Sequence, residues 1–193
     1  MIPEHAEAPI KSVYGHSTLH CFSWGPHEEE NILVVSVGEL GERPLVRVQS
    51  ACYTAEIFRS TDCDCHEQLD QSLQAVHREG GAVIYMLCDG RGAGLLTKVR
   101  SLALGHELGL DTVEAYRHLG IELDPRHYDR VAEILSALGV SQLRLLTNNP
   151  RKLAGLREAG IEVERVPLEV KPTPESRPYL ATKRDKLHHL LDL

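Results

Sequence analysis

Long apolar runs are absent from this sequence of 193 residues. The first segment, MIPEHAEAPIKSVYGH, has no apolar stretch like that of a signal peptide. No later segment approaches the roughly 18 apolar residues that a membrane-spanning helix needs. We therefore expect a cytoplasmic protein without a membrane partner. The length predicts one domain over residues 1–193, with a core large enough to fold without disulfides.

An excess of positive charge is also missing, because the formal net charge is -7. Surfaces that bind nucleic acid carry clustered positive charge over a whole face, so we expect no nucleic-acid partner. Basic residues gather only locally, in a way that suits a compact anionic ligand: Arg91, Lys98, Arg100, Arg126, Arg151 and Lys152.

Several nucleotide-site signatures are missing too. The chain has neither the His-x-Glu nor the Pro-Cys-x-x-Cys segment of zinc base deaminases. Its Gly90-x-Gly92-x-Gly94 turn does not match G-x-G-x-x-G, and Lys98 does not complete a Walker loop. Two helix starts remain that could each bind an anion, one with Arg91 and one with Thr147 and Lys152.

Apolar periodicity predicts a mixed β-sheet with flanking helices, of the α/β or α+β class. The expected strands are 31–37, 44–49, 81–88, 142–146 and 163–166, and the first two, separated by a turn-like segment, are expected to pair antiparallel. The expected helices are 66–79, 95–108, 111–119, 128–138 and a terminal appendage over about 179–191.

Three of the five cysteines, Cys52, Cys63 and Cys65, lie close together in the sequence. In a reducing compartment, clustered thiols favour metal binding or catalysis over cross-links. Zinc suits three thiolates, and three protein ligands would leave an open, catalytic position. A closed site completed by Cys88, Cys21 or His66 is the alternative, and buried inert thiols are another. Cys88 itself could be a core residue, a reactive thiol or that fourth ligand.

Five motifs together resemble GTP cyclohydrolase II of riboflavin biosynthesis. They occur in the family's order, at nearly its spacing, over about residues 10–190: RVQSAC (47–52), CDC (63–65), GR with GLL and Lys98 (90–98), DTVEA (111–115) and RLLTNNPRK (144–152). The resemblance implies that family's fold and a zinc-dependent hydrolase acting on GTP.

The resemblance also implies roles for single residues. Cys52, Cys63 and Cys65 would bind one catalytic Zn²⁺ per chain. Asp124 would be the acid-base residue, and Arg126 would attack the α-phosphate and release pyrophosphate. Zinc hydroxide would add to C8 of the purine, the ring would open to a formamide, and a second hydration would expel formate. Mg²⁺ would accompany the triphosphate, and the family's members are usually homodimers. The implied nucleotide contacts are Arg47, Val48, Gln49, Ser50, Ala51, Gln68, Asp89, Gly90, Arg91, Thr112, Thr147 and Lys152.

Departures from the family pattern concentrate near the chemistry. Gln49-Ser50-Ala51 stands where the family has His-Ser-Glu, and Leu87-Cys88-Asp89-Gly90-Arg91 where it has Arg-Gln-Glu-Gly-Arg. His66 replaces a glycine, and Leu102 aligns with a catalytic tyrosine. Three hypotheses follow: an ordinary riboflavin enzyme, a diverged cyclohydrolase with impaired formate loss, or a zinc-bearing nucleotide-binding protein without turnover. The retained thiols, Asp124 and Arg126 favour the second.

Overall fold

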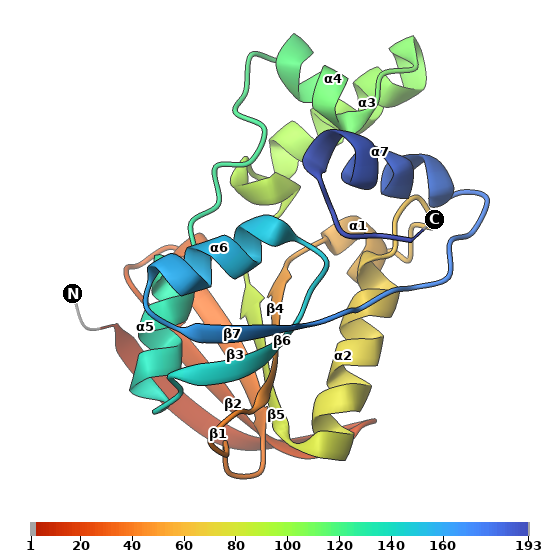
Figure 1. Ribbon diagram of the computed structural model, residues 1–193. Coiled ribbons are helices and arrows are strands. Elements are labelled where there is room, and N and C mark those ends of the chain that lie inside the picture. Colours follow the sequence, from red (N-terminus) through yellow and green to blue (C-terminus); the bar gives the residue numbers. More distant parts are fainter. Residues whose placement is uncertain (1–2, 193) are drawn as a thin grey trace. The chain divides into compact units, whose positions relative to one another are not determined.

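A seven-stranded mixed sheet carries the fold, as Figure 1 shows for the computed structural model, which describes residues 3–192. The strand order is β1-β2-β3-β5-β4-β6-β7. Strands β1, β2, β3 and β5 pair antiparallel in turn, whereas β4, β6 and β7 pair parallel. The predicted class, a mixed sheet with flanking helices, is confirmed. The strands are β1 (Glu4–Ser12), β2 (Gly15–Ser23), β3 (Asn31–Val37), β4 (Leu45–Ser50), β5 (Gly81–Met86), β6 (Gln142–Leu146) and β7 (Glu162–Val166).

The chain packs as two compact units. The first, here called the sheet unit, comprises the residues up to Gln49 together with Gln68–Leu87 and His127–Leu168. The second, here called the helical unit, comprises Ser50–Glu67, Cys88–Arg126 and the residues from Glu169 on. That residues 1–193 form one domain stays a prediction.

The predicted antiparallel pair of 31–37 and 44–49 is wrong. Both segments are strands, but β5 lies between β3 and β4. Its segment, Gly81–Met86, is almost entirely buried, which is typical of a central strand covered on both faces. Because β5 is covered on both faces, it takes a central position between β3 and β4, and these two strands do not pair with each other.

The first two strands form a hairpin that the sequence analysis did not predict. Strand β1 is exposed along nearly its whole length and is charged or polar at many positions, so it lacks the apolar alternation that signals a strand. It forms an edge of the sheet. Charged side chains on an edge strand oppose pairing with other molecules.

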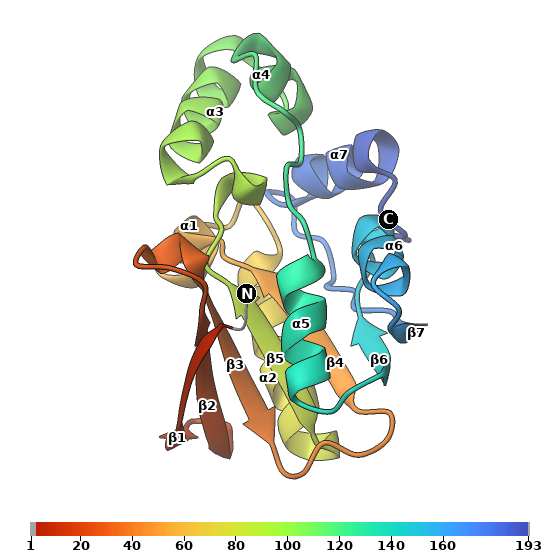
Figure 2. The ribbon, with the colours of Figure 1, turned by 90° about the vertical axis from the view of Figure 1, so that its left-hand side faces the viewer.

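Helices cover both faces of the central strands. In Figure 2, α5 (Asp129–Ala137) lies in front of the sheet and α2 (Cys65–Glu79) behind it, and Figure 1 agrees. Helix α6 (Pro150–Glu158) begins with Pro150 at its first position, and the Asn149 side chain caps it by accepting the N–H of Arg151.

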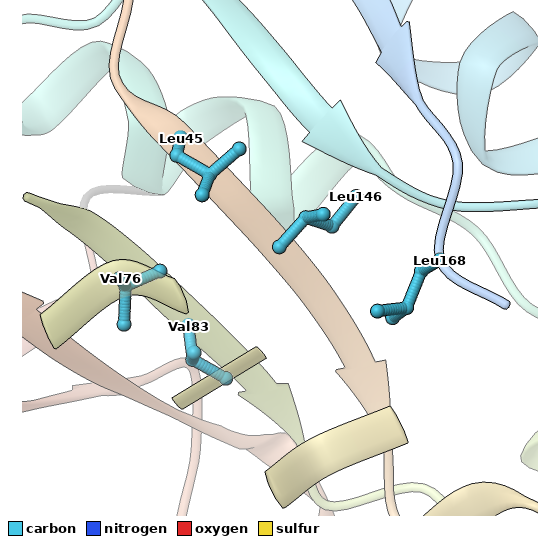
Figure 3. Close-up of a cluster of buried hydrophobic side chains, with 5 residues drawn as sticks. All are labelled: Leu45, Val76, Val83, Leu146 and Leu168. Carbon is cyan, nitrogen blue, oxygen red and sulfur yellow. The ribbon is translucent and has the colours of Figure 1, made fainter. Parts of the chain in front are cut away.

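A cluster of buried aliphatic side chains holds α2 to the sheet. Figure 3 shows Leu45 of β4, Val83 of β5 and Leu146 of β6 with Val76 of α2 and Leu168, which follows β7. Each is at most 6% exposed. Fully burying such a side chain contributes about 1.5–3 kcal/mol, so this cluster stabilises the packing of α2 on β4, β5 and β6.

The helical unit contains α1 (Tyr53–Glu56), the 3₁₀ turn η2 (Gly90–Gly92), α3 (Leu95–Leu108), α4 (Thr112–His118) and α7 (Arg177–Leu187). Helix α7 packs within this unit, where Lys186 pairs with Asp111 and Glu114 at the start of α4. Nowhere in residues 3–192 is a helix both long and apolar enough to cross a membrane.

Candidate functional site

Three cysteine side chains meet in the helical unit. Cys52 caps the start of α1, Cys63 lies in the loop that follows, and Cys65 is the first residue of α2. The Sγ atoms of Cys52 and Cys63 are 3.8 Å apart, and all three Sγ atoms lie within 4.8 Å of one another. None of the three forms a disulfide within the described residues. This arrangement can hold a metal ion that prefers sulfur in tetrahedral geometry.

The group offers three ligand atoms. Among residues 3–192 it includes neither Cys88 nor His66, the fourth ligands considered within this unit, and Cys21 belongs to β2 of the sheet unit. His66 instead contacts the guanidinium of Arg59. The described residues therefore leave the fourth position of such an ion free of a protein ligand.

One thiol of the group is far more acidic than the others. Hydrogen bonds from Cys63 and then Cys65 hold the pKa of Cys52 well below its ordinary value, with a further contribution from Lys98. The bonds that these two thiols donate to Cys52 raise the pKa of Cys63 and of Cys65. The three thiols therefore favour a state in which the negative charge lies on Cys52.

Lys98 of α3 provides a positive charge beside this sulfur. Its Nζ is 3.0 Å from the Cys52 Sγ and 2.9 Å from Oδ1 of Asp89. Burial alone would lower the pKa of Lys98, but the Cys52 thiolate and the Asp89 carboxylate outweigh it, so the pKa lies above its ordinary value. The ammonium therefore stays charged and favours the thiolate form of Cys52.

Asp89, where the family has a glutamate, holds the turn after β5 in place. Its buried carboxylate accepts the backbone N–H of Tyr53 at 2.8 Å and that of Gly90, besides its pairing with Lys98. These bonds tie the glycine turn to the start of α1. A carboxylate with these partners serves chiefly to fix local geometry.

Arg91 has a buried guanidinium whose ends find no hydrogen-bond partner. Its Nη1 and Nη2 atoms are both unpaired within the described part of the chain. Its Cζ lies 5.8 Å from the ring centre of Tyr116 and 5.9 Å from that of Tyr179. The backbone of Arg91 is left-handed, with φ 55°. An always-charged fork with unmet donors needs an anion, and carboxylate and phosphate match it best.

Asp124 and Arg126 form a two-pronged ion pair. Oδ1 of Asp124 accepts from Nε of Arg126 at 2.7 Å, and Oδ2 accepts from Nη2 at 2.8 Å. Both side chains are about nine-tenths buried. Nη1 of Arg126 donates to the hydroxyl of Ser50 at 3.1 Å. The pair orients the guanidinium and places a proton acceptor against it.

A second buried ion pair supports the cysteine loop. Nζ of Lys183, on α7, is 2.6 Å from Oδ1 of Asp64, the residue between Cys63 and Cys65. The same Nζ lies 4.6 Å from the ring centre of Tyr179. Burial opposes charge on Lys183, yet Asp64 raises its pKa above the ordinary value. Such contacts behind metal ligands fix how the ligands point.

In the sheet unit, Arg47 joins neighbouring elements. It donates to Oε1 of Gln49 from Nε and Nη2 at 3.0 and 2.7 Å, to Oε1 of Gln68 at 2.8 Å and to the Leu146 carbonyl at 3.0 Å. Nζ of Lys152 donates to the Val48 carbonyl at 2.6 Å. β4, α2 and α6 thus place these predicted residues together.

The predicted site residues therefore form two groups. Those of the sheet unit are Arg47, Val48, Gln49, Gln68, Thr147 and Lys152. Those of the helical unit are Ser50, Ala51, Cys52, Cys63, Cys65, Asp89, Gly90, Arg91, Thr112, Asp124 and Arg126. Thr112 is the first residue of α4, and Ala51 is buried at the end of β4. Leu102, on α3, is 46% exposed.

The contacts of four residues were not predicted. The motif around Lys98 was recognised, but its contact with Cys52 depends on the turn between β5 and α3. Tyr116 donates its hydroxyl to the Gly90 carbonyl at 2.7 Å, and nothing in its sequence context indicates this. Lys183 and Tyr179 are four residues apart on α7, a spacing that puts them on one face, yet the sequence does not link that face to Asp64.

Comparisons with known proteins identify the family. A family model described as GTP cyclohydrolase II matches residues 4–167. The chain is 52% identical over 198 residues to the riboflavin biosynthesis protein RibBA of Bacillus mycoides, covering 100% of this chain and 49% of that protein. It is 43% identical over 195 residues to the RibBA of Phocaeicola vulgatus, covering 99% of this chain and 48% of that one. The chain thus spans about half the length of the curated relatives it matches.

Proposed function

The chain belongs to the GTP cyclohydrolase II family, as its motifs predicted, and from this we propose that it opens the imidazole ring of GTP and releases pyrophosphate. The observation that carries the proposal lies in the helical unit, which contains a three-thiol group, a buried guanidinium without a partner and a carboxylate-bound arginine. A ring-opening hydrolase acting on a nucleoside triphosphate needs an activated water, an anion site and a group acting at phosphorus.

Cys52, Cys63 and Cys65 would hold one Zn²⁺ per chain. Their fit rests on the donor set, three sulfurs within 4.8 Å of one another, one of which is already acidic. A zinc ion held by three ligands supplies Lewis-acid activation of a water, whose pKa falls to about 7. Lys98 keeps Cys52 ionised, and Lys183 fixes the loop through Asp64.

Arg91 would bind a phosphate of the substrate. Its unmet donors, Nη1 and Nη2, form the fork that binds phosphate in two places at once. Arg47, Lys152 and the other residues of the resemblance are proposed to contact the nucleotide as well. Mg²⁺ with the triphosphate, and assembly as a homodimer, are parts of the proposal that rest on the family alone.

Arg126 would act at the α-phosphate. A guanidinium is a poor nucleophile until it loses a proton, and the two-pronged contact places Asp124 to accept one from Nη2. In this step a nitrogen–phosphorus bond forms, the bond to the leaving pyrophosphate breaks, and the proton goes to Asp124. Ser50 holds the remaining nitrogen, Nη1, through its hydroxyl.

The product is proposed to be mainly the formamide, with formate loss impaired. Hydrolysing the formamide requires a proton for a poor leaving amine, and a positioned acid can contribute about 10²–10⁴ in rate. Leu102 has no such group. The two tyrosines that could substitute are both buried. Tyr116, 1% exposed, already donates its hydroxyl to the Gly90 carbonyl, and Tyr128, 5% exposed, belongs to the sheet unit. Ala51, in place of the family's glutamate, offers no replacement either.

The test is to incubate the zinc-loaded chain with GTP and Mg²⁺, and to measure product mass, formate and pyrophosphate together. We expect pyrophosphate and a formamide product with little formate. Leu102→Tyr should convert formamide into formate release, whereas Leu108→Tyr, on the same helix and 57% exposed, should not.

Each other outcome points to a different function. Stoichiometric formate from the native chain would identify an ordinary riboflavin-pathway enzyme, in line with the RibBA relatives. Binding of GTP without any product would identify a nucleotide-binding protein without turnover.

A further inference from the structure

Two histidines and a glutamate converge on one face of the β1–β2 hairpin in the sheet unit. His5 and Glu7 are two residues apart on β1, so their side chains point to the same face of the strand. In the antiparallel register Glu7 lies opposite His20, and His5 lies opposite Phe22. Residues directly opposite share a face, so strand geometry alone brings His5, Glu7 and His20 together.

The separations between their ligand atoms match those around a small metal ion. Nε2 of His5 is 3.3 Å from Nδ1 of His20 and 3.8 Å from Oε2 of Glu7, and Nδ1 of His20 is 2.9 Å from the same oxygen. Zinc binds nitrogen and oxygen at about 2.0–2.2 Å, so tetrahedral ligands lie about 3.3–3.6 Å apart. The three atoms form a triangle close to that size before any ion is bound.

Contacts behind the histidines orient both rings. The other ring nitrogen of His20, Nε2, is 2.8 Å from the hydroxyl of Ser36 on β3, and both residues are buried. When Nε2 carries the proton and donates it to Ser36, Nδ1 presents a lone pair toward Glu7. The ring of His5 stacks on Phe22 at 4.3 Å. Metal-binding histidines are typically held in this way through their second nitrogen.

We propose that His5, Glu7 and His20 form a second metal site, which takes a divalent transition-metal ion of the zinc type. Two imidazoles and one carboxylate are ligands that zinc uses, and a carboxylate offsets half of the ion's charge. The side chains of His5 and Glu7 are 36% and 57% exposed, so the ion can enter from solvent and water can complete its coordination. Bound there, the ion would join the exposed edge strand β1 to β2.

A hydrogen bond can also account for the short distances between His5, Glu7 and His20. The alternative is a hydrogen-bonded network in which His20 donates from Nδ1 to Glu7 and no metal binds. The two possibilities differ in stoichiometry, because only a metal site adds an equivalent of bound ion.

The experiment measures bound zinc per chain after dialysis of the full chain against Zn²⁺. We expect His5→Ala and Glu7→Gln each to bind one equivalent fewer than the native chain. Both residues are exposed, so these variants should fold. An unfolding curve recorded without metal, compared with that of the native chain, verifies this. His16→Ala is the matched control, an exposed histidine on β2 outside the group, and should bind as much as the native chain. Ser36→Ala should lower the affinity for this same zinc ion about 10- to 100-fold.

A cobalt substitution separates this site from the cysteines. Glu7→Gln should lose one equivalent of Co²⁺ while its thiolate-to-cobalt absorption stays that of the native chain. Equal zinc in the native chain and in Glu7→Gln would overturn the proposal. Because the result is a difference between variant and native chain, it stands apart from whether the thiols bind zinc or the chain acts on GTP.

Discussion

Arg47 in the sheet unit and Arg91 in the helical unit bury the same side chain in opposite ways. Arg47 is 5% exposed and donates to two glutamines and a backbone carbonyl. Both Nη atoms of Arg91 are buried as well, but they have no hydrogen-bond partner among residues 3–192, and the guanidinium lies near the rings of Tyr116 and Tyr179. The resemblance implies nucleotide contact for both. The structure indicates that the first joins strands and helix, whereas the two Nη donors of the second are unmet within the described residues.

A third arginine, Arg126, differs from both because it is already paired with a carboxylate, that of Asp124. If Asp124 orients it for attack at phosphorus, Arg126→Ala should lower pyrophosphate release by about 10³-fold or more, since losing a nucleophile removes the chemical step itself. Pyrophosphate assays with GTP measure this, and zinc content should not change.

Arg100→Ala provides the matched control for Arg126→Ala. Arg100 is an exposed arginine of α3 in the same unit, and its loss should leave pyrophosphate release within about twofold of native. Normal release by Arg126→Ala would mean that its pairing with Asp124 is structural, as that of Lys183 with Asp64 is.

Arg47 should affect stability more than Arg91 does. Arg47→Met leaves the oxygens of Gln49, Gln68 and Leu146 without this donor, and each acceptor left unmet costs about 1–3 kcal/mol. We expect the free energy of unfolding in urea to fall by about 3 kcal/mol.

Arg43→Met is the control for Arg47→Met. Arg43 is a half-exposed arginine paired with Glu162 and Glu164 at 3.7 and 3.2 Å, and its loss should change the free energy by less than about 1 kcal/mol. Equal losses in the two variants would contradict the joining role of Arg47.

Much of the fold could be predicted because apolar periodicity is local. The expected strands 142–146 and 81–88 and the expected helices 66–79 and 95–108 are close to β6, β5, α2 and α3. Strand order was not predictable in the same way. In the sheet, β3 and β4 are separated by β5, which follows both of them and α2 in the sequence. The hairpin was missed because β1 is an exposed edge without alternation.

The site could be predicted where its residues adjoin in sequence and not where distant ones meet. Cys63 and Cys65 lie two residues apart, and this spacing predicted that they share a site with Cys52. Asp124 and Arg126 are equally close in sequence, but they were predicted only through the family resemblance. Lys183 and Asp64 are 119 residues apart. No local pattern specifies such a contact, which depends on how α7 packs in the helical unit.

Arg91 should affect ligand binding rather than stability. Arg91→Ala removes a phosphate fork, and a bond between charged groups contributes about 1.5–3 kcal/mol, so the Kd for GTP should rise about 10- to 100-fold. Unfolding in urea should show no loss of stability, because no hydrogen bond of the described structure is broken. Calorimetric titration measures the Kd. A destabilised variant with unchanged Kd would mean that Arg91, like Arg47, serves the scaffold.

Tyr116 should show the smallest effect, because it acts on Arg91 through the turn. Its hydroxyl donates to the buried Gly90 carbonyl at 2.7 Å, while its ring faces the guanidinium. Tyr116→Phe keeps the ring and loses one hydrogen bond, so we expect the free energy of unfolding to fall by about 1 kcal/mol. The looser turn should raise the Kd for GTP less than Arg91→Ala does. Tyr179→Phe is the matched control, since its ring faces the same guanidinium and its hydroxyl donates no hydrogen bond among the described residues. If both variants weaken GTP binding equally, the bond from Tyr116 to Gly90 is not what holds Arg91 in place.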